Sequence, residues 1–176
     1  MKKCCFSGHR TIPEKELPNL KIDLDVTLRG LIAEGVCEFF CGGARGFDLL
    51  AAENVLYLKK TYPFLKLHLI LPCKGQEEFW SKEDKEQYYS VLALADSVEF
   101  LYEKYNNHCM FERNRALTDS ADILLCYLTN DSGGTAYTVK LAAKKKMRII
   151  PVGIGKDEKI LFELNFLSGQ TELENI

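Results

Sequence analysis

Apolar and polar positions along the chain follow two different periods. Short, almost wholly apolar runs such as Leu67–Leu71 and Ile123–Leu128 are typical of strands buried on both faces of a sheet. Between such runs, apolar residues recur every three or four positions, which is the spacing of one buried helical face. The predicted strands are Lys3–Ser7, Val36–Cys41, Lys66–Leu71, Ser97–Tyr102, Asp122–Leu128 and Arg148–Gly153. The predicted helices are Leu17–Glu34, Phe47–Lys60, Ser81–Ala95, Met110–Ser120 and Thr135–Lys146.

This alternation of strands and helices predicts an α/β fold. A strand that returns to the same sheet through a helix does so by a right-handed crossover, so we expect a mostly parallel sheet of about six strands. The length of 176 residues fits one domain, 1–176, and no linker or repeat divides it. Residues 156–176 combine charges with apolar side chains, and we expect them to form a tail or short helix packed on the domain.

Composition and charge exclude several classes of protein. The chain is 47% hydrophobic and 27% charged, which is typical of a globular protein, and its net charge of −2 provides no basic field for nucleic acid. No apolar run approaches the ~20 residues of a membrane span. The seven cysteines are odd in number and lack C-x-x-C spacing, so we expect a cytoplasmic protein with no metal site of its own.

Glycine-rich and polar clusters follow the predicted strands and are sparse at the opposite ends of the strands. The clusters are Ser7-Gly8-His9-Arg10, Gly42-Gly43-Ala44-Arg45-Gly46, Pro72-Cys73-Lys74-Gly75-Gln76, Tyr105-Asn106-Asn107 with Arg113-Asn114, and Thr129-Asn130-Asp131-Ser132-Gly133-Gly134-Thr135. The carboxyl ends of parallel strands meet at one edge of the sheet, which is where open α/β sheets bind ligands. We therefore predict a ligand site at this edge.

Two of these clusters join a strand directly to a helix, around Gly42–Gly46 and around Ser132–Thr135. Glycine lets an anion approach the free N–H groups of the following helix, whose dipole favours negative charge. Arg45 would add a bidentate donor for phosphate, with Arg10 as a further cation. Tight turns also use glycine for conformational reasons alone. Neither segment has the Gly-Lys-Ser/Thr of a Walker A loop or the Gly-x-Gly-x-x-Gly of dinucleotide binding.

Candidate ligand residues share this edge of the sheet. They are Gly8, His9, Arg10, Gly42, Gly43, Arg45, Gly46, Asp48, Arg113, Asn114, Ser132, Gly133, Gly134 and Thr135. Asp48 begins a helix and could serve as a cap or as an acceptor for ribose hydroxyls. Asp48 and Glu53 are the candidate catalytic carboxylates, although Glu53 could equally lie on the surface.

Several of these motifs, in this order and spacing, resemble the YpsA family of the SLOG superfamily. The motifs are Ser7-Gly8-His9-Arg10, Gly42–Asp48 with Ala51-Ala52-Glu53, Pro72…Gln76…Trp80, Arg113-Asn114 and Gly133-Gly134-Thr135. The resemblance implies a Rossmann-like three-layer α/β/α fold that binds a nucleotide or nucleotide-derived ligand. It also implies a sensing or regulatory role, and this family has been linked to bacterial stress and cell division.

Two related groups supply the alternatives. The Ala-Arg-Gly-Phe-Asp segment resembles DprA proteins, which bind single-stranded DNA, and Gly-Gly-Thr resembles LOG phosphoribohydrolases, which cleave N-glycosidic bonds. Thr138 stands where LOG enzymes carry a glutamate tied to hydrolysis, and threonine cannot act as a carboxylate base. Nucleotide binding is therefore the leading hypothesis, and hydrolysis through Glu53 or Asp48 and DNA binding are the alternatives. Cofactor use and pairing into a homodimer remain open.

Overall fold

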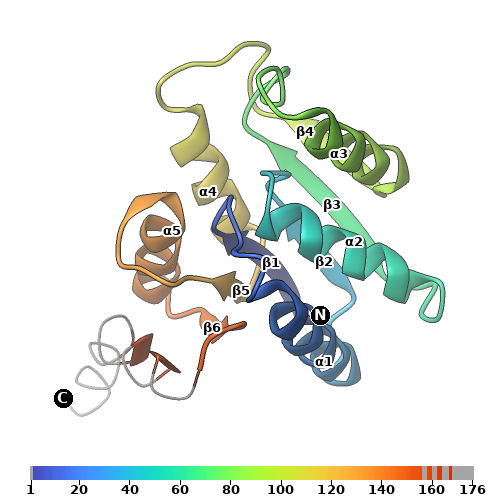
Figure 1. Cartoon of the computed structure of the whole chain (residues 1–176), viewed down its shortest axis with the longest axis vertical. Helices are drawn as coiled ribbons and strands as arrows, with labels where there is room; N and C mark the ends of the chain where they lie inside the picture. The colour runs from blue at the N-terminus through green and yellow to red at the C-terminus, as the bar shows by residue number, and fades with distance from the viewer. Residues whose placement is uncertain (1, 156–157, 160–161, 164–166, 168–176) are drawn as a thin grey trace.

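The computed structural model describes residues 2–155, 158–159, 162–163 and 167 (Figure 1). Strands and helices alternate along the chain as predicted. The strands are β1 (Lys3–Gly8), β2 (Glu38–Cys41), β3 (Lys66–Leu71), β4 (Ser97–Phe100), β5 (Ile123–Tyr127) and β6 (Arg148–Pro151). The helices are α1 (Leu17–Ala33), α2 (Phe47–Lys59), α3 (Lys82–Leu94), α4 (Cys109–Asp119) and α5 (Gly133–Lys144).

The six strands form one parallel sheet in the order β4-β3-β2-β1-β5-β6, which confirms the predicted α/β Rossmann-like class. Successive strands β1 to β4 extend the sheet in one direction, and β5 then returns to lie beside β1 on its other side. The chain therefore changes direction between β1 and β5, where Gly8 is paired with Tyr127 at the carboxyl ends. In sheets of this kind such a switch point leaves a crevice for ligands.

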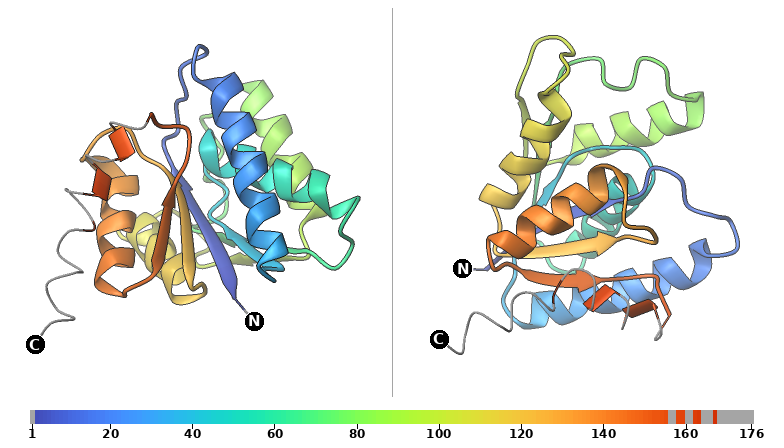
Figure 2. Two further views of the ribbon diagram at one scale, coloured as in Figure 1. Left: turned by 90° about the horizontal axis from the view of Figure 1, so that it is seen from below. Right: turned by 90° about the vertical axis from the view of Figure 1, so that its left-hand side faces the viewer.

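Helices cover both faces of the sheet, with α1, α2 and α3 on one face and α4 and α5 on the other (Figures 1 and 2). Each face has its own hydrophobic cluster. Leu20 and Leu49 pack with Phe39 on the α1–α3 side, whereas Leu117 and Val139 pack with Leu124 on the other. Alternate residues of a strand point to opposite faces, so the central strands are apolar throughout, as the sequence pattern predicts.

Local signals set the ends of several elements. The Ser81 hydroxyl accepts the N–H of Asp84 at 3.1 Å and caps α3, as expected for an N-cap serine. Helix α1 ends before Gly35, which has the positive φ of 91° that favours glycine. Pro151 lies in β6, at the edge of the sheet, where its missing N–H costs no ladder hydrogen bond.

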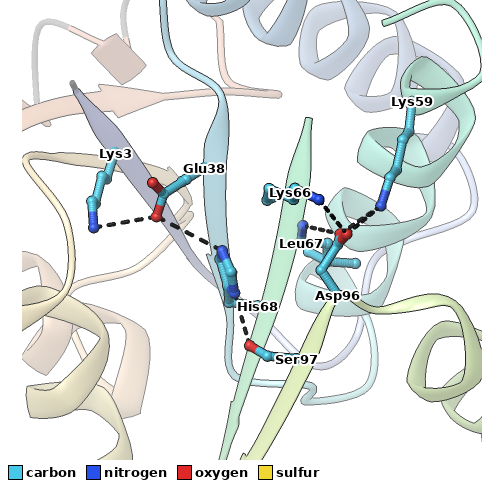
Figure 3. A network of polar contacts seen from close by, with 8 residues as sticks. All are labelled: Lys3, Glu38, Lys59, Lys66, Leu67, His68, Asp96 and Ser97. Atoms are coloured by element: carbon cyan, nitrogen blue, oxygen red, sulfur yellow. Dashed lines mark hydrogen bonds and ion pairs between the residues drawn. The ribbon is translucent and has the colours of Figure 1, made fainter. Parts of the chain in front are cut away.

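Ion pairs fix the opposite edge of the sheet, at the amino ends of the strands (Figure 3). The Asp96 carboxylate accepts hydrogen bonds from Lys59 Nζ at 2.6 Å and from the N–H of Leu67 at 2.9 Å. Burial alone would raise the pKa of Asp96, but these hydrogen bonds outweigh it and lower the pKa to about 2. His68 Nε2 lies 3.7 Å from a Glu38 carboxylate oxygen in the same region.

The prediction of a packed tail at residues 156–176 lies mostly outside the described residues. Of the described ones, Phe162 is buried in the cluster on the α4–α5 side of the sheet. Among the described residues, no helix has both the length and the apolar character needed to cross a membrane.

Candidate functional site

A polar cavity of about 200 Å³ opens at the carboxyl ends of β1 and β5, at the switch point of the sheet. Loops and helix ends from separate parts of the chain form its walls. The lining residues are Ser7, Gly8, His9, Arg10, Ala44, Asp48, Met110, Arg113, Asn114, Ser132, Gly133, Gly134 and Thr135. The structure thus gathers residues of the β1, β2 and β5 loops and of α4 around one space.

Most of the candidate residues from the sequence line this cavity, but the first glycine loop contributes few of them. Gly42, Gly43, Arg45 and Gly46 lie outside the lining. Ser7, Ala44 and Met110 line it and are missing from the candidates. Ser7 and Ala44 stand inside the motifs that marked the site, so the motifs carried a signal for them, whereas nothing in the sequence singles out Met110.

The loop after β1 is held in place by its own glycine and histidine. A Cβ at Gly8 would lie 2.4 Å from the Phe47 side chain, so this strand end admits only glycine. His9 Nε2 accepts the N–H of Thr129 at 2.9 Å, which requires that nitrogen to be unprotonated. Burial also lowers the pKa of His9 from its ordinary value. A neutral His9 therefore ties the β1 loop to the β5 loop at the edge of the cavity.

Arg10 brings a positive charge to the cavity wall. Its Nη2 lies 4.0 Å from Met110 Sδ, and among the described residues no carboxylate lies within 4.0 Å of its guanidinium. The other arginines near the site are engaged within the protein: Arg45 with Asp84 and Arg113 with Asp48. Arg10 can therefore turn its donors towards an anion without breaking an ion pair.

The first glycine loop requires glycine because other protein atoms occupy the space that side chains would need. A Cβ at Gly42 would lie 2.2 Å from Arg113 Nη1, and one at Gly46 would lie 2.5 Å from the Arg10 carbonyl oxygen. Gly46 also has a positive φ of 80°, which L side chains rarely adopt. These glycines allow helix α4 and the β1 loop to approach α2 closely, so the structure assigns them a packing role.

Arg45 does not line the cavity. Its guanidinium Nη1 lies 3.8 Å from an Asp84 carboxylate oxygen in the first turn of α3, and its side chain is 42% exposed. An exposed ion pair of this kind contributes little to stability. Arg45, which the sequence suggested as a donor to phosphate, therefore pairs with Asp84 of α3. Arg10 lines the cavity and can donate to an anion there.

Asp48 is buried in the first turn of α2, where the helix dipole favours its negative charge. Burial raises the pKa of Asp48 to about 6, although nearby Arg113 and hydrogen bonds from the backbone of Ala44 and Gly8 oppose this shift. The other candidate carboxylate, Glu53, is exposed on α2 and accepts a hydrogen bond from Gln87 Nε2 at 2.8 Å. Of these two acids, only Asp48 lines the cavity.

Two adjacent residues of α4 connect the glycine loops. Arg113 Nη1 donates to the Gly42 carbonyl at 2.5 Å, and its Nε donates to Asn114 Oδ1 at 2.8 Å. Asn114 Nδ2 in turn donates to the Gly134 carbonyl at 3.5 Å. Arg113 Nη1 also lies 4.0 Å from Asp48, and both side chains are buried. Helix α4 therefore holds the position of the second glycine loop relative to the first.

The second glycine loop presents the amino end of α5 to the cavity. The cap residue Ser132 donates its hydroxyl to Asn130 and makes no hydrogen bond to the helix. Gly133 has a positive φ of 84°, and an added Cβ would meet no atom within 4 Å. The first N–H groups of a helix have no partner within the helix, and the dipole favours an anion there. This helix end is therefore suited to hold a phosphate.

Thr138 supplies no acid to the site. It is buried, and its hydroxyl donates to the Gly134 carbonyl at 2.8 Å, one helical turn earlier. This local hydrogen bond fixes the first turn of α5. The position where LOG enzymes carry a glutamate thus supports the backbone of the glycine loop here.

The parallel sheet and the polar cavity at its switch point define a Rossmann-like α/β protein. The chain belongs to the YpsA family, described as the YspA SLOG family, whose model matches residues 11–151. A UPF0398 protein of Brevibacillus brevis is 39% identical over 155 residues, with 82% of each chain covered. The UPF0398 protein YpsA of Bacillus subtilis is 32% identical over 136 residues, with 76% of each chain covered.

The fold is also similar to a solved structure of DNA processing protein A from Helicobacter pylori, reported with its mode of single-stranded DNA binding. The TM-score is 0.66 at 17% sequence identity, and the match covers 93% of this chain and 72% of the other. At this identity the similarity concerns the fold of the two proteins.

Proposed function

We propose that the protein binds a nucleotide or nucleotide-derived ligand, with a phosphate held by the first turn of α5 and by Arg10. The observation that carries this proposal is the meeting of two anion-binding features in one cavity: a helix amino end opened by Gly133 and Gly134, and an arginine without a carboxylate partner among the described residues. Charge-assisted hydrogen bonds from arginine and helix N–H groups are the usual means of holding phosphate in proteins.

The rest of the cavity suits binding without turnover, as in a sensing or regulatory domain. Glu53 lies outside the cavity, and Thr138 is committed to the backbone. Membership of the YpsA family supports this proposal, because the family resemblance implies ligands of this class and a role in bacterial stress or cell division.

One observation favours a second candidate, hydrolysis of an N-glycosidic bond. Asp48 lines the cavity, and its pKa of about 6 lies near the range that a general acid or base needs at neutral pH. In this case Asp48 would exchange a proton with water or with the leaving base. Replacing Asp48 by Asn would then abolish release of the base while leaving some binding.

A thermal-shift series with nucleoside monophosphates, NAD and ADP-ribose tests both candidates. A ligand at 100 times its dissociation constant stabilises the protein by ~2.7 kcal/mol, which gives a measurable shift. A shift that Arg10→Ala removes and that Lys15→Ala retains supports phosphate binding, since Lys15 is an exposed cation in the same loop. Mass spectrometry of each ligand after incubation separates binding from hydrolysis.

The absence of any shift at millimolar ligand would contradict the proposal. Salt-dependent retardation of single-stranded DNA in place of nucleotide binding would favour the DNA-binding alternative, because phosphate contacts along a strand are strongly sensitive to salt. The net charge of −2 argues against that outcome.

A further inference from the structure

The cavity lining combines two kinds of polar group. The α5 amino end and Arg10 offer hydrogen-bond donors and positive charge. Asp48 offers acceptors, and its charge is partly balanced by Arg113, whose Nη1 lies 4.0 Å away. An anionic ligand group therefore favours the α5 amino end and Arg10, whereas Asp48 favours a ligand group that donates a hydrogen bond.

Contacts from the described residues leave part of the acceptor capacity of Asp48 unused. A carboxylate offers about four acceptor positions on its two oxygens. The backbone N–H groups of Gly8 and Ala44 occupy two, and Arg113 Nη1, at 4.0 Å, is beyond hydrogen-bond distance. Because Asp48 lines the cavity, a ligand group that meets it must be a donor, and a hydroxyl group satisfies this requirement without adding charge.

The size of the cavity decides how much of a ligand it can hold. Small-molecule sites usually measure roughly 300–1,000 Å³, and this cavity of about 200 Å³ is smaller. A phosphate with its attached sugar is therefore the part of a nucleotide that can be enclosed. The base would lie at the mouth of the cavity, outside the ring of polar side chains.

We propose that this site recognises the ribose 5′-phosphate part of its ligand, with the phosphate at the α5 end, a ribose hydroxyl donating to Asp48, and the base left unread. This inference rests on the proposed function, because it presumes that α5 and Arg10 hold the phosphate. It adds a class of ligand, 5′-phosphorylated ribosides of any base, and a role for Asp48 as the group that distinguishes ribose from deoxyribose.

Isothermal titration of the wild-type protein with four nucleotides tests the inference without any variant. The probes are AMP, UMP, 2′-deoxy-AMP and 3′-deoxy-AMP. We expect AMP and UMP to bind with dissociation constants within about threefold of each other. At least one of the two deoxynucleotides should bind about 10- to 100-fold more weakly than AMP, because it lacks a hydrogen bond to a charged group.

A pair of variants then assigns the discrimination to Asp48. In Asp48→Asn the difference between AMP and the weaker deoxynucleotide should shrink to about threefold or less, since the charge on the acceptor is gone. Glu53→Gln is the matched control, because it removes a carboxylate from the same helix outside the cavity, and it should keep the full difference. If Asp48→Asn does not fold, the wild-type titrations alone decide.

The outcomes separate this inference from the proposed function. Equal binding of AMP and both deoxynucleotides overturns the role of Asp48, and a preference of more than about tenfold between AMP and UMP overturns the unread base. In both cases phosphate binding at α5 stands. If none of the four nucleotides binds while NAD or ADP-ribose does, this inference fails and the proposed function stands. If none of these ligands binds, both fail.

Discussion

The guanidinium of Arg113 occupies the space that a side chain at position 42 would need. Its Nη1 donates to the Gly42 carbonyl at 2.5 Å, and a Cβ on Gly42 would lie 2.2 Å from the same nitrogen. The bare first loop and the buried arginine of α4 therefore depend on each other. Several properties of the site follow from this arrangement and from the charges around it.

Removing the Arg113 side chain should destabilise the protein strongly. In Arg113→Ala, buried Asp48 loses the cation that opposes the rise of its pKa by burial, and the Gly42 carbonyl loses its donor. Breaking a buried pair in this way costs about 3–5 kcal/mol, which urea unfolding would detect. Arg115→Ala, at an exposed position of the same helix, should stay within about 0.5 kcal/mol of wild type. Similar stabilities for the two variants would contradict the connecting role of Arg113.

The two arginines of the glycine motifs should differ in their effect on ligand binding. Arg10→Ala should weaken nucleotide binding about 10- to 100-fold, because it removes a charged donor to phosphate. Arg45→Ala should change the dissociation constant by less than about threefold, because Arg45 pairs with Asp84 away from the cavity. Titration calorimetry of both variants with AMP measures this difference. A larger loss of affinity in Arg45→Ala than in Arg10→Ala would indicate that the phosphate binds at the first glycine loop.

Gly134→Ala should lower the affinity for AMP without lowering the stability of the protein. The added Cβ would lie 3.8 Å from Asn114 Nδ2, an ordinary contact, and alanine is favourable in a helix. The melting temperature should therefore stay the same or rise. The new methyl group would stand on the helix end that we assign to phosphate, so the affinity for AMP should fall. A stable variant with wild-type affinity would show that the anion binds elsewhere.

The protonation of Asp48 should make its contribution to stability depend on pH. Its pKa is raised in the folded state from 3.8 to about 6, so the folded protein holds the proton more tightly than the unfolded chain. The free energy of unfolding should thus decrease as the pH rises from about 4 to about 6, by roughly 3 kcal/mol at ~1.4 kcal/mol per pKa unit. The difference in stability between wild type and Asp48→Asn across this range isolates the effect. A constant difference would contradict it.

His9 should be neutral at pH 7, with its proton on Nδ1, because its Nε2 accepts the N–H of Thr129. Its pKa is lowered in the folded state by burial, so the associated stability should be lost as the pH falls below the ordinary histidine pKa of 6.5. Nitrogen chemical shifts of the imidazole ring would report the tautomer. A protonated ring at pH 7 would mean that the link between the β1 and β5 loops is absent in solution.

Much of the fold could be predicted from the sequence. The predicted bounds of the helices and strands differ from the observed ones by at most two residues, because glycines, prolines and caps such as Ser81 mark the ends. The location of the cavity could also be predicted from the sequence, because a parallel sheet brings the glycine clusters to one edge. These features depend on local patterns and on general rules of chain connection.

The sequence did not predict that the first glycine loop would pack against protein atoms while the second lines the cavity. Both loops have the same signature, a strand followed by glycines and a helix, although only the first contains an arginine, Arg45. Arg10 lines the cavity, whereas Arg45 does not and lies 3.8 Å from Asp84, a residue distant in sequence. Which glycines face a ligand depends on Arg113, which fills the space above Gly42. Long-range packing decides both questions, and a single sequence does not reveal it.

Helices α2 and α5 begin in similar glycine turns after β2 and β5, the strands on either side of β1, yet of these two helices only α2 carries a carboxylate in its first turn. At the amino end of α2, Asp48 supplies the negative charge that the helix dipole favours. At the amino end of α5, a bound anion would have to supply it. A change at position 48 to a neutral residue would leave both helix ends without an internal anion. This backbone could therefore accept ligands of different total charge through a single substitution, which offers related chains a simple route to new ligands.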